Sequence, residues 1–208
     1  SGNVSINYVR LQNVTATGGA TFTANNVTDF GGNNGWSINT APSKNLYWIG
    51  NGGNWTDAFH WSLTSGGTSS GCIPSPHDNV YFDALSFTAS GQTITVDQTI
   101  VQCADMNWTG VTNAPTFAGT YSNILRIYGS LTLAGGMSQS FNGALVFEAT
   151  STGKTITSAG KSFNSSITFN GIGGGWTIQD ALTTSDNIIN LINGSLNTNN
   201  QTVSAGSF

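Results

Sequence analysis

The residues of this chain that could do chemistry are few, and two of them lie close together. The sequence holds nine carboxylates, two histidines and two cysteines. Asp57 and His60 both fall in the aromatic stretch YWIGNGGNWTDAFHWS, from Tyr47 to Ser62, where they could form a catalytic or metal-binding pair. No predicted helix places them on one face, and no serine turn or third orienting group accompanies them. The pattern therefore favours a surface turn.

The three tryptophans of the same stretch could have either a binding role or a structural role. Trp48, Trp55 and Trp61 lie among Asn, Gly and Asp, and exposed aromatic rings in such a setting could form a stacking platform for sugars. Large apolar rings can instead cover the open end of a β-sheet core, where unpaired strand edges would otherwise recruit another chain. We favour the structural cap and expect Ile49 and Phe59 to be buried with the tryptophans. The isolated tryptophans are predicted to be packed as well: Trp36, Trp108 and Trp176.

The run His77-Asp78-Asn79, with Asp83 nearby, offers several oxygen ligands. Calcium prefers such ligands, but the run lacks the spacing of a calcium loop or of a calcium-binding repeat. Asp78 is better suited to cap the turn made by Pro74 and Pro76 through backbone amides. No cofactor is predicted, and calcium stays open as an alternative.

The two cysteines, Cys72 and Cys103, are 31 positions apart and belong to no CxxC motif. A zinc site is therefore poorly supported. In an oxidising compartment a disulfide closing this loop would contribute about 3 to 4 kcal/mol. Two free, buried thiols are the alternative.

Composition excludes several classes of function. Only 7% of the 208 residues are charged and the net charge is −4, against about 25% charged residues in an average soluble protein. The five basic residues cannot neutralise a run of phosphates, so nucleic-acid binding is not expected: Arg10, Lys44, Arg126, Lys154 and Lys161. No apolar run approaches the roughly 20 residues that cross a bilayer, and residues 1–10 lack the pattern of a signal peptide. We expect a soluble chain that is a piece of a larger protein.

An internal repeat appears in the second half at a shift of 22 residues. When Phe141–Ala159 is laid over Phe163–Ala181, seven of nineteen positions coincide without a gap. Each unit carries two short alternating segments separated by Gly, Ser and Asn, which is the length and pattern of one coil of a parallel β-helix. Inward positions would stack on like residues of the next coil, and four are predicted to point inward: Phe141, Phe147, Phe163 and Phe169.

The sequence therefore predicts an all-β fold, a right-handed parallel β-helix with about 22 residues per coil. A β-sandwich is the alternative, although a fixed period without gaps argues against it. Three regions are expected: 1–45, a strand-rich end of one repeat; 46–110, an aromatic and proline-rich junction with the first strands of the next; and 111–208, the coils of the β-helix.

Enzymes that cleave polysaccharides also use parallel β-helices, and they need clustered acidic or basic residues on one face. Glu148 and Asp180 are 32 positions apart, which does not fit a 22-residue coil, so the repeats align no acid pair. The chain is therefore not predicted to be an enzyme.

Several segments together resemble a known family. YVRLQNVTATGGATFTANNVTDFGGNNGW (8–36), YWIGNGGNWTDAFHWSLTSGG (47–67) and GCIPSPHDNVYFDALSF (71–87) are similar to repeats of the very large cell-surface adhesins of Bacteroidota, the SprB-like gliding-motility adhesins that are type IX secretion substrates. FNGIGGGWTIQDALTT (169–184) and GSLNTNNQTVSAGSF (194–208) extend the resemblance. In this family pattern DFGGNNGW closes one repeat and YWIGNGGNW opens the next.

The resemblance implies a non-enzymatic segment of a repetitive adhesin that acts in surface attachment and gliding motility at the cell surface. The implied partners are neighbouring repeats, surfaces or polysaccharides, and, through the parent protein, the outer-membrane motility and secretion machinery. A polysaccharide-binding or polysaccharide-degrading β-helix is the alternative. No ligand residues are carried over from the family. A cell-surface setting also favours the Cys72–Cys103 disulfide.

Overall fold

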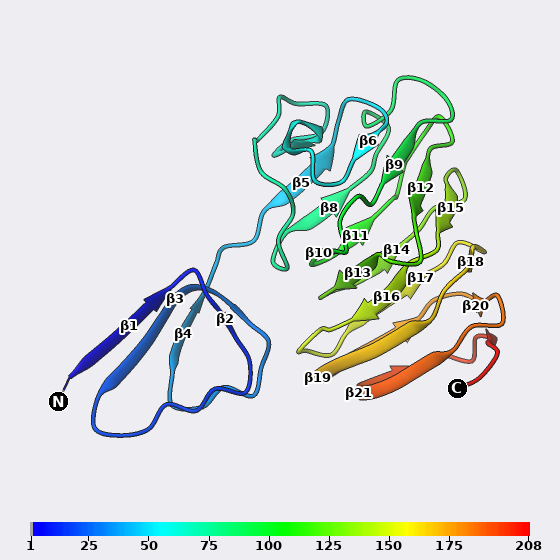
Figure 1. Cartoon of the computed structure of the whole chain (residues 1–208). Helices are drawn as coiled ribbons and strands as arrows, with labels where there is room; N and C mark the ends of the chain where they lie inside the picture. Colours follow the sequence, from blue (N-terminus) through cyan, green and yellow to red (C-terminus); the bar gives the residue numbers. More distant parts are fainter. Residues whose placement is uncertain (1) are drawn as a thin grey trace. The chain divides into compact units, whose positions relative to one another are not determined.

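The computed structural model describes residues 2–208, which form two compact units (Figure 1). The first ends at Ser43 and the second runs from Lys44 to Phe208. The described chain is built from short β-strands, and its single helical element is the 3-10 turn η1 (Ala58–His60). None of the described helices is long and apolar enough to span a membrane.

The first unit is a small stack of parallel strands. Its central strand β3 (Thr21–Asp29) pairs with β1 (Asn3–Asn7), β2 (Arg10–Leu11) and β4 (Ser37–Thr40). Three buried side chains form its core, with half-buried Ile6, Val9, Trp36 and Ile38 around them: Leu11, Ala24 and Val27. A core of this size provides little apolar burial, so this unit depends strongly on its backbone ladders.

The second unit is a parallel β-helix in which each complete coil contributes strands to three faces. We call these faces 1, 2 and 3. The strands of face 1 are β10 (Ile100–Cys103), β13 (Ile124–Ile127), β16 (Ala144–Phe147) and the first parts of β19 (Ile167–Ile178) and β21 (Ile189–Asn197).

Face 2 lies next along each coil, and the long strands β19 and β21 run across the corner from face 1 to face 2. Its strands are β5 (Asn45–Trp48), β8 (Asn79–Tyr81), β11 (Met106–Asn107), β14 (Leu131–Thr132), β17 (Lys154–Thr157) and the later parts of β19 and β21.

Face 3 consists of two groups of paired strands. The first is β6 (Gly53–Asn54), β9 (Thr93–Thr95), β12 (Thr116–Gly119) and β15 (Ser138–Phe141), and the second is β18 (Ser162–Phe163), β20 (Leu182–Thr184) and β22 (Val203–Ser204). The one antiparallel pair between strands of the described chain joins β5 to β7 (Trp61–Ser62).

The register confirms the predicted coil. Leu145 pairs with Ile167 and Ile167 with Ile189, which are steps of 22 residues, whereas Leu131 pairs with Ile156 after 25. A β-sandwich is excluded because the ladders are parallel and connect one coil to the next. All four phenylalanines predicted to point inward are buried: Phe141, Phe147, Phe163 and Phe169.

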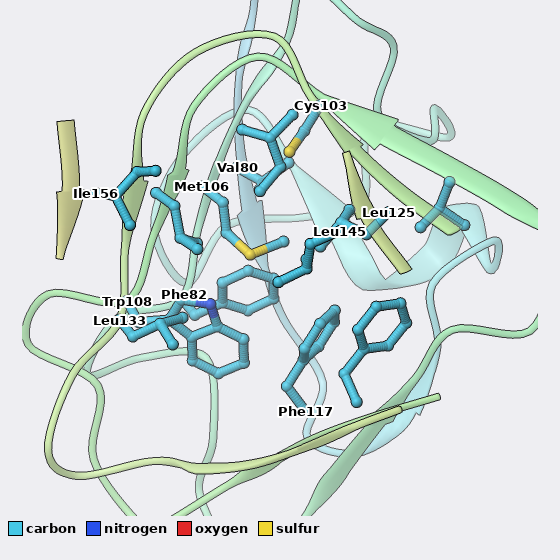
Figure 2. Close-up of a cluster of buried hydrophobic side chains, with 14 of the residues drawn as sticks. Val80, Phe82, Cys103, Met106, Trp108, Phe117, Leu125, Leu133, Leu145 and Ile156 are labelled. Carbon is cyan, nitrogen blue, oxygen red and sulfur yellow. The ribbon is translucent and has the colours of Figure 1, made fainter. Parts of the chain in front are cut away.

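The core of the second unit is continuous along the stack because alternate side chains of each short strand point inward. Figure 2 shows part of this cluster, in which Phe82 stacks on Trp108 with ring centroids 3.9 Å apart. Two coils later, Phe147 stacks on Phe169 at 5.1 Å. Residues of the expected junction, 46–110, belong to the same core and the same sheets as the later coils. The β-helix therefore begins at β5 rather than at residue 111.

The bend inside β19 requires glycine because another coil passes close to it. A Cβ atom on Gly171 or Gly174 would clash with the carbonyl oxygen of Ala149, because the two atoms would be closer than van der Waals contact allows. The sequence GIGGGW thus permits one strand to turn the corner between face 1 and face 2 and to place Trp176 in the core.

Candidate functional site

The three tryptophans of the opening stretch are not available as a sugar platform. Trp48, Trp55 and Trp61 are at most 1% exposed, and Trp61 lies edge-to-face against the other two with centroids 5.1 and 5.0 Å away. The indole N–H of Trp61 donates to the carbonyl of Trp55 at 2.8 Å, and that of Trp48 to the carbonyl of Asn51 at 2.5 Å. They cover the N-terminal end of the β-helix core, as a structural cap would.

The other aromatic predictions had mixed outcomes. Phe59 is 78% exposed, so the expectation that it is buried with the tryptophans was wrong. Phe59 lies in η1, the turn at which the chain reverses toward β7, and its side chain points outward. Ile49 is half-buried. Trp108 and Trp176 are fully buried, and Trp36 packs edge-to-face on Phe22 at 5.4 Å in the first unit.

Asp57 and His60 have structural roles. Asp57 caps η1 by accepting from the amide of Phe59 at 2.9 Å. The His60 ring stacks on Trp48 at 4.6 Å, and its Nδ1 donates to the carbonyl of Ile49 at 2.7 Å. Its Nε2 is 3.8 Å from Asp57 Oδ2, and a Cβ atom on Gly53 would overlap the ring. The histidine thus holds the cap in place, and Gly50 and Gly53 leave room for its ring.

Asp78 caps the proline-rich turn, as predicted. Its carboxylate accepts from the amides of Lys44 and Ser75, both at 2.9 Å, and from the Ser75 hydroxyl at 2.6 Å. Asp78 is 3% exposed. The searched residues, 2–208, contain no group of three or more His, Cys, Asp or Glu that could hold a metal ion.

The same use of carboxylates extends through the chain. Seven of the nine accept backbone amides: Asp29, Asp57, Asp78, Asp83, Asp97, Asp105 and Asp180. Charged acceptors make the stronger backbone hydrogen bonds, so each acid secures either a local turn or a contact between neighbouring coils. These carboxylates are already engaged by the protein's own backbone.

An eighth carboxylate, Glu148, forms the ion pair of the middle coils. Arg126 Nη1 donates to Glu148 Oε1 at 2.6 Å across one 22-residue coil. Burial, followed by a hydrogen bond to Glu148, raises the pKa of Tyr128 well above the usual range for a tyrosine. Sequence reasoning missed this cluster, although the 22-residue offset of Arg126 and Glu148 could have indicated it.

The two cysteines are free, which corrects the predicted disulfide. Cys72 is exposed in the loop after the cap, whereas Cys103 is buried and lies inside the core cluster of Figure 2. Burial, with added repulsion from Asp105 and Asp78, raises the pKa of the Cys103 thiol far above its ordinary value. Cys103 is the inward residue at the end of β10, so its side chain points into the core rather than toward the loop.

A row of tyrosine and asparagine side chains marks the outer surface of face 2. Tyr47 on β5 and Tyr81 on β8 stack with centroids 4.9 Å apart and an interplanar angle of 20°. Beside them the Nδ2 of Asn79 donates to Asn45 Oδ1 at 3.0 Å. We call these four residues, Asn45, Tyr47, Asn79 and Tyr81, the tyrosine row.

The tyrosine row continues as a polar strip across the face. Tyr81 pairs in register with Asn107, which pairs with Thr132, and Thr132 pairs with Thr157. Burial raises the pKa of Tyr81, and the nearby Tyr47 and Asp105 raise it further. Its hydroxyl therefore remains a neutral donor and acceptor. Rings flanked by amides and hydroxyls can bind a polyol by hydrogen bonds and apolar contact without desolvating a charge.

The tyrosine row was missed because its coil is longer than the repeat. NLYW (45–48) and NVYF (79–82) follow one pattern, Asn, apolar, Tyr, aromatic, at a distance of 34 residues. Their alternation places Leu46 and Val80 in the core and both tyrosines outside. A search for that pattern, rather than for a fixed period, would have found the row.

Comparisons with family models, with curated proteins and with solved structures give no match for this chain.

Proposed function

We propose that this chain is a non-enzymatic segment of a large, repetitive cell-surface adhesin that acts in surface attachment and gliding motility. The observation that carries the proposal is that the charged and the neutral polar side chains of the β-helix lie in different places. Carboxylates are engaged in turns and one ion pair, while the outer surface of face 2 presents the tyrosine row and its strip of Asn and Thr. The resemblance to Bacteroidota adhesin repeats supports the same assignment.

The polar strip suits weak binding to the hydroxyls of a surface polysaccharide. Neutral phenols and amides lose little solvation when they exchange water for sugar hydroxyls, so each contact contributes modestly. Many copies along one polypeptide raise the total avidity by effective concentration. A stiff β-helix keeps such strips in a fixed orientation, which favours simultaneous engagement. Neighbouring repeats and the outer-membrane motility and secretion machinery are the partners that this function implies.

A glycan array probed with this chain, with and without calcium, identifies the polysaccharide class. The double variant Tyr47→Ala, Tyr81→Ala is expected to lose at least about tenfold in affinity, since stacked aromatic and hydrogen-bonding groups are removed together. Tyr121→Ala, at a tyrosine that is 81% exposed away from the row, is the matched control and should bind like the parent.

Two results would contradict the proposal. Unchanged binding by the folded double variant would remove the tyrosine row from the binding surface. Release of reducing ends or unsaturated sugars from acidic or neutral polysaccharides would show the rival activity, a lyase or hydrolase on a β-helix.

A further inference from the structure

One row of outward side chains on face 2 keeps hydrogen-bond donors free. It occupies the last outward position of each strand, before the chain turns toward face 3. Asn107 shows the pattern, because its carbonyl oxygen accepts from the amide of Thr109 at 2.8 Å while its Nδ2 donates to no group of residues 2–208. The tyrosine and threonine hydroxyls at the equivalent positions likewise have no partner in the described chain. We call these five side chains the donor row: Tyr47, Tyr81, Asn107, Thr132 and Thr157.

The donor row is straight because its members pair in register from strand to strand. Tyr47 lies opposite Tyr81, and Tyr81 lies opposite Asn107. Thr132 and Thr157 continue the same ladder. All five side chains are half-buried, so each keeps part of its surface in solvent. Neighbouring strands are about 4.8 Å apart, and the row therefore offers one donor at each such step along the stack of coils.

The row beside it is engaged by the protein itself. Two residues earlier on successive coils, Asn79 Oδ1 accepts from the amide of Asp105 at 3.2 Å, and Asp105 Oδ1 accepts from that of Ser130 at 2.6 Å. Ser130 Oγ then accepts from the amide of Thr155 at 3.1 Å. These bonds fix each coil to the next beneath the donor row, so a ligand would meet a row that is already ordered.

Charge selects among the ligands that such a row could bind. The donor row has no charged side chain, and Asp105 is the single charge of the engaged row beside it. Neither row holds a cation that could pair with an acidic group of a ligand, whereas the Asp105 carboxylate would repel such a group. The two rows therefore favour a neutral ligand whose hydroxyls recur at the spacing of the strands.

We propose that the donor row binds a neutral, extended β-1,4-linked polysaccharide that lies along the stack of coils, with about one sugar ring to each coil. One ring of such a glycan covers nearly the same length as the spacing between strands, and its equatorial hydroxyls project from the edges of a flat ribbon. An α-1,4-linked glycan curves away from a straight row instead. This inference rests on the glycan binding proposed above, and it specifies the class and the direction of that ligand.

Isothermal titration with cello-oligosaccharides of increasing length, from cellobiose to cellohexaose, tests the match. The affinity is expected to rise with each added glucose up to about five, the length of the donor row. The overall gain should be at least about tenfold, since each additional hydrogen bond contributes modestly. Malto-oligosaccharides, the α-1,4-linked isomers, should show no such rise beyond the disaccharide. Oligomannuronates, which are β-1,4-linked and acidic, should bind more weakly than the neutral series at every length.

Variants assign the binding to the donor row. The double variant Thr132→Val, Thr157→Val removes two hydroxyls and keeps β-branched side chains that suit strands, and it should reduce the affinity for cellohexaose about tenfold. Thr168→Val makes the same change at a half-buried outward position of face 1 and should bind like the parent. Melting temperatures verify that each variant is folded, and the oligosaccharide series on the parent chain needs no variant.

The outcomes distinguish this inference from the proposed function. Length-independent binding that still requires Tyr47 and Tyr81 would overturn the extended ligand and leave the glycan-binding function intact. An equal rise with malto-oligosaccharides, tighter binding of oligomannuronates, or an unchanged affinity of the folded threonine variant for cellohexaose would overturn it too. If neither the glycan array nor the cello-oligosaccharide series shows binding, the proposed function fails together with it.

Discussion

The two ends of the β-helix differ in how far their core side chains and outermost strand edges are covered. At the N-terminal end, Trp48, Trp55 and Trp61 close the core, and β7 reverses direction to pair with β5. Among the described residues, β21 of the last coil pairs with β19 and is covered on its other side only at its start, and its Leu191 and Ile192 are exposed. A parallel stack exposes one unpaired ladder at each end. The difference teaches that the aromatic stretch caps the start of the β-helix, whereas the coil of β21 keeps part of its apolar surface in solvent.

The largest effect is expected from the capped end. Trp61→Ala removes a fully buried indole and its hydrogen bond to Trp55, and it should reduce the free energy of unfolding by about 3 to 5 kcal/mol. Urea unfolding followed by tryptophan fluorescence measures the change. An unaltered midpoint would show that the core does not need this cap.

A smaller loss is expected from the turn that holds the first strand of the cap. Asp78→Ala leaves the amides of Lys44 and Ser75 without their acceptor, which should cost about 2 to 3 kcal/mol, since hydrogen bonds to a charged group are involved. Thermal unfolding compares it with Asp186→Ala, a carboxylate in a turn of the last coils, which should have a smaller effect. Equal losses would abolish the contrast between the two ends.

Alkaline pH tests the middle coils, which lie between the two ends. The pKa of Tyr128 is raised in the folded protein, chiefly by burial, so the unfolded chain loses this proton at a lower pH than the folded one. The contribution of Tyr128 to stability is therefore constant below the ordinary tyrosine pKa of about 10 and is lost as the pH rises above it. Melting temperatures between pH 7 and about 11 should show this fall, and Tyr128→Phe should reduce it. A parallel fall in the variant would assign the effect to other groups.

At the open end, Leu191→Ala should change the free energy of unfolding by less than about 1 kcal/mol, because a side chain that is 42% exposed loses little burial. Chemical unfolding at a concentration low enough to keep the chain monomeric gives the value. A loss as large as that of Trp61→Ala would mean that the two ends are equally closed.

The two thiols differ in solvent exposure, and their reactivity tests this difference without a change in the stability of the protein. Cys72 is exposed on the loop after the cap, while Cys103 is buried with a strongly raised pKa, so iodoacetamide should alkylate Cys72 rapidly and Cys103 only on unfolding. Mass spectrometry of the unreduced native protein follows both. Failure of both to react until a reductant is added would indicate that the disulfide forms after all.

The sequence alone determined the coil and its inward residues. Where coils are regular, the 22-residue period identified Phe147 and Phe169 as stacked neighbours, because strand alternation and the spacing of turns are local properties of the chain. The role of Asp78 followed from its proline-rich turn for the same reason. Phe59 was assigned wrongly because composition indicates an aromatic cluster but not which way a short turn directs each ring.

Only the tertiary structure decided which residues meet across irregular coils. The cap lengthens the first coil, so Tyr47 and Tyr81 stack although they are 34 positions apart, and no fixed period predicts that pairing. Cys103 is kept from Cys72 because strand alternation directs it into the core, a direction that depends on the register of β10 with β13. The partial exposure of Leu191 is likewise a property of the assembled stack. A strand's sequence specifies its pattern, but the neighbours of its edge are set by the coils that lie beside it.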